Sequence, residues 1–316
     1  MARRAALAAA GVVVVVATAA VIWVLGRRSV PGSGSGTPLT SDPVPTTSAP
    51  PAVDVLAVKI DNVAAARPQT GLGAAAVVYV EPVEGGVTRL LALYTGKRPA
   101  VVGPVRSARR TDLHLLAQWG KPTLGYSGAA PELLPAIRGA DLTDASEERV
   151  PRAYYRDQSR RIPHNLFLRP ARLPTTTTAH VPLQFGPAPP GGTAATAHTA
   201  RFEAARFDFT WSGGRWLVSL DGTPLTSTES GRVGAATVVH QRVKASADES
   251  VEDASGFRSP VVTGIGEGSA VVLRDGKRFA VTWSRPSAAS PTTFHTAAGD
   301  PVPLAPGPVW ILLTPA

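Results

Sequence analysis

An uncharged segment of 21 residues near the start of the chain limits what this protein can be more than any other feature. It covers residues 5–25, includes the valine run at residues 12–16, and has arginine pairs on both sides. At about 1.5 Å of rise per residue, such a helix is roughly 30 Å long and matches the hydrocarbon core of a bilayer. We expect one membrane-spanning anchor with Trp23 at the interface. A secretory signal cleaved after Ala19 is the alternative.

The segment that follows, residues 29–51, is built from residues that do not form a core. Of its 23 residues, 18 are Gly, Pro, Ser or Thr, a composition typical of a flexible tether. Anchor, tether and a long apolar-rich remainder predict a single-pass protein of the cell membrane. We expect residues 1–28 to form the cytoplasmic end and the anchor, and the globular part to be extracytoplasmic. The cytoplasmic membrane is therefore the first expected partner.

The composition excludes several kinds of site. The chain of 316 residues has no cysteine, which rules out disulfides, thiolate metal sites, a cysteine nucleophile and lipid attachment through cysteine. The six histidines are scattered, and we expect neither a metal nor a cofactor. The net charge is +9, with four of the arginines in residues 1–28. The remainder is mildly basic and favours anionic partners, and outside the cytoplasm nucleic acid is not among them.

Residues 52–185 alternate between strand and helix patterns, which predicts an α/β domain. Residues 53–61 alternate with a period of two, and Leu56 is on the face expected to lie in the core. Lys59 and Asp61 therefore project together from the opposite face.

A hairpin is predicted over residues 74–94, with Gly85-Gly86 supplying positive φ in its connection. Arg89 alternates in step with apolar neighbours. If that face is buried, Arg89 needs a carboxylate partner, and Glu81 or Glu84 is nearest in sequence. Helices are expected at residues 113–119 and 131–138, with Thr111 or Ser107 capping the first.

Residues 186–192 are rich in Pro and Gly and mark the expected boundary to a second domain, residues 186–316. Turns are close together there and helical periodicity is nearly absent, which predicts a β-rich domain. Gly213-Gly214 and Asp275-Gly276 are expected hairpin turns. The tryptophans expected in its core are Trp211, Trp216, Trp283 and Trp310. The predicted fold class is therefore mixed, with an α/β domain followed by a β-rich domain.

Charged and aromatic residues of the first domain form the candidate ligand-binding set. Arginines beside carboxylates lower the carboxylate pKa, so these groups suit ligand clamping or structural ion pairing better than proton transfer. The arginines and tyrosines of residues 149–161 suit phosphate, carboxylate or sugar. The candidates are Lys59, Asp61, Asn62, Arg67, Glu81, Glu84, Arg89, Arg106, Ser107, Arg109, Tyr126, Ser127, Tyr155, Arg156, His164 and Asn165.

One short motif indicates nucleophilic catalysis. The run Gly125-Tyr126-Ser127-Gly128-Ala129 resembles a nucleophile elbow except for its last residue. His164 follows Ser127 after far fewer residues than separate the serine and the histidine in typical hydrolases of that class. The alternative structure is a Ser-Gly turn before a helix. The sequence therefore does not identify catalytic residues.

Several short motifs occur in one order along the chain. They are Lys59-Ile60-Asp61-Asn62, Arg67-Pro68-Gln69-x-Gly71, Val83-Glu84-Gly85-Gly86-x-Thr88-Arg89, Gly103-Pro104-Val105-Arg106-Ser107-x-Arg109, Tyr126-Ser127-Gly128, Tyr154-Tyr155-Arg156-Asp157 and Pro163-His164-Asn165-Leu166. From about residue 52 to the C-terminus, this pattern resembles the YerB-type lipoprotein family of bacteria, whose biochemical function is unknown. The resemblance implies a membrane-attached, extracytoplasmic protein of two parts and supplies no reaction. Without a lipidation cysteine, a helix has to provide the anchor.

Three hypotheses follow for the function. The leading one is a non-catalytic envelope protein that binds an anionic or glycan ligand of the wall, such as an anionic wall polymer or peptidoglycan, or an envelope protein involved in wall assembly. The second is an envelope hydrolase or transferase that acts through Ser127 with His164, or through Glu81 with Glu84. The third is a scaffold in which every charge is paired internally. Convergence of Ser127 and His164 in space would favour the enzyme.

Overall fold

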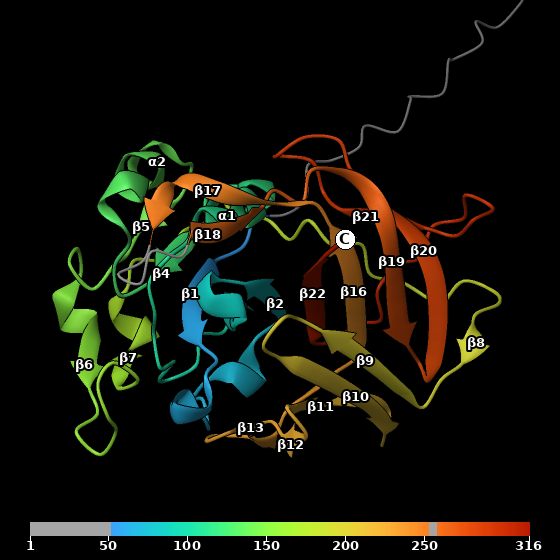
Figure 1. Cartoon of the computed structure of the whole chain (residues 1–316), viewed down its shortest axis with the longest axis horizontal. Coiled ribbons are helices and arrows are strands. Elements are labelled where there is room, and N and C mark those ends of the chain that lie inside the picture. Colours follow the sequence, from blue (N-terminus) through green and yellow to red (C-terminus); the bar gives the residue numbers. More distant parts are fainter. Residues whose placement is uncertain (1–51, 253–257) are drawn as a thin grey trace, which may run out of the picture. The chain divides into compact units, whose positions relative to one another are not determined.

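The computed structural model describes residues 52–252 and 258–316, with side chains except for those of residues 249–257 (Figure 1). The predicted anchor and tether lie outside the described residues. In the described part of the chain, no helix has the length and apolar character needed to cross a bilayer. Residues 52–252 and 258–316 belong to one compact unit.

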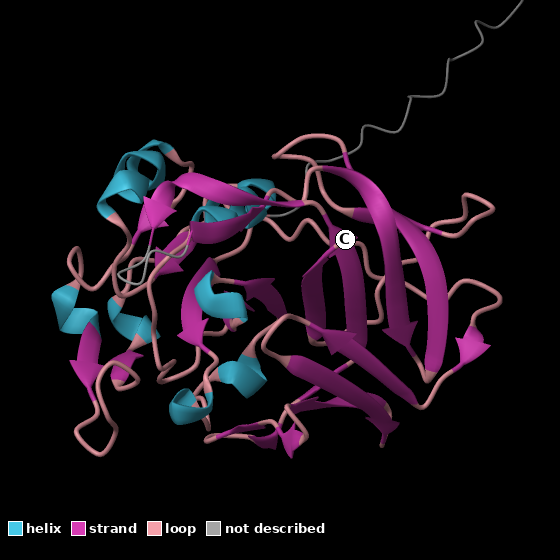
Figure 2. Cartoon of the chain, viewed as in Figure 1, coloured by secondary structure: helices cyan, strands magenta, loops and turns pink. Residues whose placement is uncertain are grey.

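A central sheet of 11 strands runs through this unit (Figures 1 and 2). In order across the sheet its strands are β21 (Thr293–His295), β20 (Lys277–Arg285), β19 (Gly266–Arg274), β16 (Thr237–Val243), β22 (Val309–Pro315), β2 (Val77–Pro82), β3 (Thr88–Thr95), β1 (Val55–Asp61), β4 (Thr123–Gly125) and β5 (Thr143–Asp144), and β8 (Thr193–Ala194) pairs with β20. Strands from both sides of the predicted boundary at residues 186–192 therefore belong to one sheet.

The direction of the strands brings several carboxyl ends to one edge. β22 is parallel to both β2 and β16, and β1 is parallel to β4. β3 is antiparallel to β1 and to β2, so those two strands also run in the same direction. The ends of β1, β2 and β4 consequently lie at the same edge of the sheet, beside the start of β3.

The smaller sheets are built mainly from the second half of the chain. One has five strands: β12 (Thr223–Pro224), β11 (Arg215–Leu220), β10 (Arg206–Ser212), β9 (Ala197–Arg201) and β15 (Gly234–Ala235). The two-stranded pairs are β13 (Thr226–Ser227) with β14 (Gly231–Arg232), β17 (Ala245–Glu252) with β18 (Arg258–Val262), and β6 (Tyr154–Arg156) with β7 (Leu166–Leu168).

The helices of the described residues are short and all lie before residue 173. The α-helices are α1 (Arg110–Leu116) and α2 (Leu134–Gly139), and the 3-10 turns are η1 (Ala64–Ala66), η2 (Leu72–Ala74), η3 (Glu84–Gly86), η4 (Ala117–Trp119), η5 (Pro131–Leu133), η6 (Pro151–Ala153) and η7 (Pro170–Arg172). The predicted mixed, strand-rich fold class is thus present in the described residues, with the helices in the predicted first part and both parts joined in one sheet (Figure 2). The expected cap is wrong, since the α1 N-cap is Arg109.

Both faces of the central sheet are covered by apolar side chains. Leu56 and Val58 of β1 belong to one apolar cluster, together with Trp216 and Trp310. Ala57 belongs to a second cluster on the opposite face. The expectation of one buried face for this strand is therefore too limited, because every residue of β1 is buried.

Three of the four tryptophans expected in the core are buried, and the fourth packs against one of them. Trp216, Trp283 and Trp310 are buried. The ring of Trp211 is partly exposed and its centroid lies 5.3 Å from that of Trp216. The predicted hairpin turns are also present, and Gly213, Gly214 and Gly276 have positive φ.

A pair of histidines connects two sheets and predicts a pH-dependent stability. His198 Nε2 on β9 lies 2.9 Å from His240 Nδ1 on β16, and His240 Nε2 lies 2.9 Å from the Thr314 hydroxyl. Burial, together with the positive potentials of His198 and Arg242, lowers the pKa of His240 to about 4. Burial and Arg278 likewise lower the pKa of His198.

Because the folded-state pKa of His240 is below its unfolded value, its contribution to stability is complete above pH 6.5 and is lost as the pH falls toward 4. Allowing for partial exposure, we expect the free energy of unfolding to fall by on the order of 2 kcal/mol across this window. Urea unfolding at several pH values measures it. His240→Gln should reduce the slope and His295→Gln should not; equal slopes in both variants would contradict the assignment.

Candidate functional site

The candidate residues gather where the parallel strands end. Asp61 of β1 is in register with Arg89 of β3, and Arg89 is in register with Glu81 of β2. Residues directly opposite one another in a sheet point to the same face, and Lys59 is two residues before Asp61. The predicted joint projection of Lys59 and Asp61 is therefore present, and the charges lie on the face that carries α1.

Lys59 is completely buried between two carboxylates. Its Nζ atom contacts Glu81 and lies 2.9 Å from Asp112 Oδ1 in α1. Burial lowers the pKa of Lys59 to about 8, against the opposing attraction of Asp112. The other Asp112 oxygen accepts the Arg109 backbone N–H at 2.7 Å. Lys59, Glu81 and Asp112, which we call the Lys59 triad, thus connect β1 and β2 to the first turn of α1.

Asp61 is the centre of a second group, which we call the Asp61 cluster: Asp61, Arg89, Arg106 and His164. Asp61 Oδ1 lies 3.4 Å from Arg89 Nη1, and Oδ2 lies 3.4 Å from Arg106 Nε and 2.6 Å from His164 Nδ1. The carboxylate is fully buried, whereas the Arg106 and His164 side chains remain 26% and 20% exposed. One carboxylate therefore faces two guanidinium groups and an imidazole.

The partner of Arg89 differs from the prediction. Asp61 pairs with Arg89, whereas Glu81 pairs with Lys59 and Glu84 pairs with Arg109. Sequence distance favoured the two glutamates, but the register of β1 with β3 brings Asp61 opposite Arg89.

Glu84 and Arg109 form a separate ion pair. Arg109 donates from Nε and Nη2 to the two Glu84 oxygens, at 2.6 and 2.9 Å. Ser259 of β18 also donates to Glu84. Burial alone would raise the pKa of Glu84, but Arg109 and Ser259 outweigh it, and the pKa lies below its usual value. The hydrogen bond from Ser259 to Glu84 thus connects the β17–β18 hairpin to this edge of the sheet.

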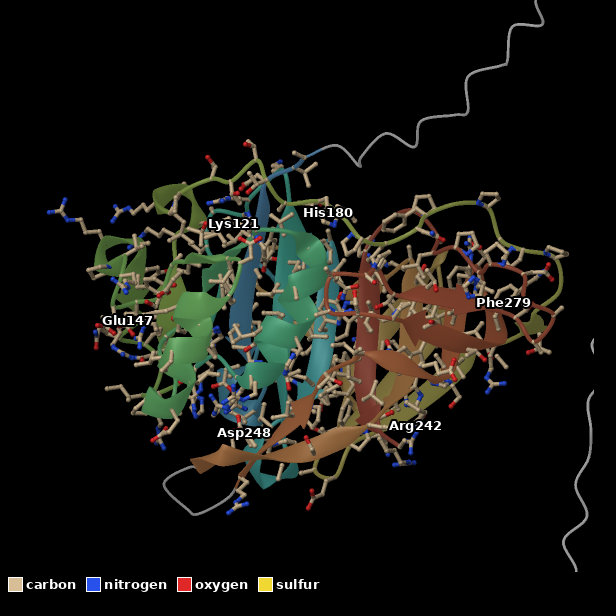
Figure 3. The ribbon with its side chains drawn as sticks, turned by 90° about the horizontal axis from the view of Figure 1, so that it is seen from above. Lys121, Glu147, His180, Arg242, Asp248 and Phe279 are labelled. Carbon is tan, nitrogen blue, oxygen red and sulfur yellow. The ribbon has the colours of Figure 1, made fainter. Side chains whose placement is uncertain are left out.

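A second ion pair fastens the same hairpin to α1. Arg110 Nε lies 2.7 Å from Asp248 Oδ2, and Figure 3 labels Asp248 on this hairpin. The Thr111 hydroxyl, predicted as a cap, accepts the Val262 backbone N–H at 3.0 Å. Ser259 and Asp248 were not predicted as part of the site, because nothing near them in sequence indicates contact with residues 84–111.

The loop after β1 is held by amide groups. Asn62 donates to the Thr88 hydroxyl at 2.7 Å, and Arg67 donates to the Asn62 carbonyl and lies 3.1 Å from Asp221. Gln69 is buried and donates to the Asp61 carbonyl at 3.1 Å. Gln69 therefore holds the Asp61 backbone, and the partly exposed Arg67 side chain is bound to Asn62 and Asp221.

Ser127 and His164 are not joined by a hydrogen bond among the described residues, so the convergence that would favour a catalytic pair is not seen there. The Ser127 backbone N–H donates to the Arg106 carbonyl at 3.0 Å, and the described residues show no hydrogen bond between its hydroxyl and His164. Tyr126 is buried, with its N–H donating to the Tyr154 hydroxyl at 3.1 Å, and burial raises the pKa of its phenol. Ser107, also a candidate, accepts a bond from Arg109 through its carbonyl.

The remaining candidates belong to the β6–β7 hairpin. The Arg169 guanidinium lies over the Tyr155 ring, 3.9 Å from its centroid. The Tyr155 ring also stacks on Phe167, with the two ring centroids 5.8 Å apart. Arg156 donates to the buried Asn165 side chain at 3.0 Å. These contacts occupy the Tyr155 ring and the Asn165 amide.

A cavity lies beside this edge of the sheet. It has a volume of about 270 Å³ and includes the ends of β2 and β22, with Glu84, Glu203 and Arg258 as its charged lining residues. In open α/β sheets ligands commonly bind outside the carboxyl ends of the strands. The described residues contain no group of three or more histidine, aspartate or glutamate side chains arranged to hold a metal ion.

The buried triad predicts a large effect of removing its cation. In Lys59→Met, Glu81 and Asp112 would be buried without a positive partner, and we expect a loss of about 3–5 kcal/mol in the free energy of unfolding. Lys97→Met is the matched control, since Lys97 is exposed, and its effect should stay within about 0.5 kcal/mol. Urea titration of both variants measures the difference, and similar small losses would contradict a stabilising triad.

The chain was compared with known families and structures. The models "Protein of unknown function (DUF3048) N-terminal domain" and its C-terminal counterpart match residues 39–181 and 196–311. A Bacillus subtilis (strain 168) protein named "Putative lipoprotein YerB" is 48% identical over 54 residues, 17% of this chain and 16% of that protein. The match thus spans less than a fifth of that relative.

A crystal structure of YerB from Bacillus subtilis has the same fold. It superposes with a TM-score of 0.71 at 20% sequence identity, covering 84% of this chain and 92% of that one. Because the identity is low, this likeness concerns the fold alone. The resemblance seen in the sequence motifs is confirmed, and the chain belongs to the DUF3048 family of proteins of unknown function.

Proposed function

We propose that this protein is an extracytoplasmic envelope protein that binds an anionic ligand at the Asp61 cluster. The observation that carries the proposal is the charge around Asp61, where a single carboxylate faces Arg89, Arg106 and His164. Arg106 and His164 are partly exposed, so a phosphate or a carboxylate from solution can reach their N–H groups. Guanidinium groups suit such planar or tetrahedral anions.

Two observations support a place at the cell envelope. Residues 5–25 have the length and composition of a membrane-spanning helix. The relative from Bacillus subtilis is named a putative lipoprotein, a name that places that protein at a membrane. At that location, an anionic polymer of the cell wall is an anionic ligand that the protein would encounter.

The other hypotheses have less support. Tyr155 already contacts Arg169 and Phe167, which disfavours stacking on a sugar at this ring. A pure scaffold accounts for the Lys59 triad and for the Glu84–Arg109 pair, because each cation there has a carboxylate. It does not account for the excess of cationic groups at Asp61.

One observation favours a second candidate, a hydrolase or transferase. Asp61 accepts a hydrogen bond from His164 Nδ1 at 2.6 Å, which leaves Nε2 as the basic atom. The two glutamates are held in separate ion pairs, and Ser127 has no hydrogen bond to His164 among the described residues, so neither predicted catalytic set supports this candidate. In this candidate His164 would activate a water molecule or a hydroxyl of the substrate.

Binding of poly(glycerol phosphate) to the full-length chain in detergent tests the proposal. Calorimetric titration at two salt concentrations should give saturable binding that weakens with salt. Arg106→Ala should weaken it by about tenfold or more, because it removes charge-assisted hydrogen bonds. Arg138→Ala is the matched control, since Arg138 is exposed on α2, and should bind as the parent does.

Three outcomes distinguish the hypotheses. Equal affinities of the two arginine variants, or no binding, would contradict the anion site. Release of glycerol phosphate, followed by phosphorus NMR and lost in His164→Gln, would favour the enzyme. Binding without turnover that depends on Arg106 supports the binding protein.

A further inference from the structure

The β6–β7 arm, which we define as residues 151–172, presents an unusually exposed aliphatic side chain. Ile162 lies in the loop between β6 and β7 and is 75% exposed, whereas Phe185 and Ile265 are 42% and 38% exposed. An isoleucine held in water at this exposure gains nothing from the fold itself. Its position at a loop between two strands makes it available to an external apolar phase.

The same arm is rich in arginine. The arm contains six arginines and one acidic residue, Asp157. Within the described residues, Arg156 pairs with Glu147 and Arg160 with Asp157. The arginines of the arm that have no carboxylate partner among the described residues are Arg152, Arg161, Arg169 and Arg172. Arg161 is exposed and directly precedes Ile162.

The arm is held rigidly against the body of the protein. Arg160 donates to the carbonyls of Ala66 and Pro68, at 3.2 and 2.8 Å. Its guanidinium also lies over the Phe167 ring, 5.3 Å from the centroid. The His164 side chain contacts Asp61. The loop is therefore fixed on both sides of Ile162, and little conformational entropy is lost when it binds.

We propose that the β6–β7 arm contacts an anionic lipid surface, with Ile162 entering the headgroup layer and Arg161 beside lipid phosphates. An isolated aliphatic side chain among cations suits this layer, where apolar burial and attraction to anionic lipids act together. A stable interface with a protein buries about 800 Å² on each side and has several apolar residues at its centre, whereas among large apolar side chains this arm exposes Ile162 alone. A soluble anionic polymer would make no use of Ile162.

The proposal goes beyond the anion site but rests on the envelope location proposed above. His164 is two residues from Ile162 and contacts Asp61. Contact of the arm with lipid would therefore place the Asp61 cluster close to the membrane surface. Anionic groups presented at that surface would be the first to reach Arg106.

The absence of cysteine allows a direct test on the full-length chain. Gln158→Cys in the arm and Ala298→Cys in a distant exposed turn each provide a single site for an environment-sensitive fluorophore. The labelled chains are reconstituted into nanodiscs of phosphatidylcholine with or without phosphatidylglycerol. We expect a blue shift, and quenching by spin-labelled lipid, only for the Gln158→Cys label and only with phosphatidylglycerol.

Second substitutions in the Gln158→Cys chain identify the groups responsible. Ile162→Asp and Arg161→Glu should each lower the ratio of lipid-contacting to water-exposed label by at least about tenfold. Phe185→Asp is the matched control at another exposed apolar residue and should leave the ratio unchanged. Circular dichroism of each variant verifies that the fold is intact.

Other results would overturn the proposal. Equal emission in the two lipid mixtures would exclude the arm as the lipid contact, and a shift that persists in Ile162→Asp would exclude Ile162 as the side chain that enters the headgroup layer. A shift produced by soluble poly(glycerol phosphate) without anionic lipid would identify a polymer partner instead. Arg106→Ala should lose polymer binding and keep the lipid-dependent shift, so failure of the anion site and failure of the lipid contact are separately visible.

Discussion

The position of β22 in the middle of the central sheet is the constraint on which the remaining structure depends. It is parallel to β2 on one side and to β16 on the other, so it joins the helix-containing half to the all-strand half. The carboxyl ends of these strands consequently face one edge. The charged residues of β1 and β2 and the cavity beside Pro82 and Pro315 all lie at that edge. A different location for β22 would separate β2 from β16 and remove Pro315 from the lining of the cavity.

The charges at this edge differ in their roles although they are close in sequence. Lys59 and Arg109 each have carboxylate partners and are withdrawn from water to different extents. Such pairs add less to stability than their geometry suggests, because burying ions is costly, but they fix how the elements fit together. Asp61 is surrounded by more cationic groups than carboxylates, whereas Lys59 lies between two carboxylates. The two groups therefore depart from one-to-one pairing in opposite directions, and the cationic groups in excess are those beside Asp61.

Much of the fold could be predicted because it depends on local patterns. Alternating residues identified β1, and the glycine pairs identified the hairpin turns. The site was predicted less completely. Residues on one strand, such as Lys59 and Asp61, share a face by periodicity alone, whereas the partners Asp112, His164 and Ser259 come from segments whose positions depend on tertiary packing. The shared sheet was missed for the same reason, since a Pro- and Gly-rich stretch indicates a turn but does not say whether strands beyond it pair with those before it.

The pairing of β2 with β22 also has a consequence for the order of assembly. Val77 is in register with Val309, so β2 can complete its hydrogen bonding only after nearly all of the described residues have been synthesised. Until then, the β2–β3 hairpin has an unpaired and strongly apolar edge, which is a template for association with other chains. A sheet in which most contacts join residues far apart in sequence forms slowly. The growing chain therefore depends on protection of that edge for most of the time that it takes to be made.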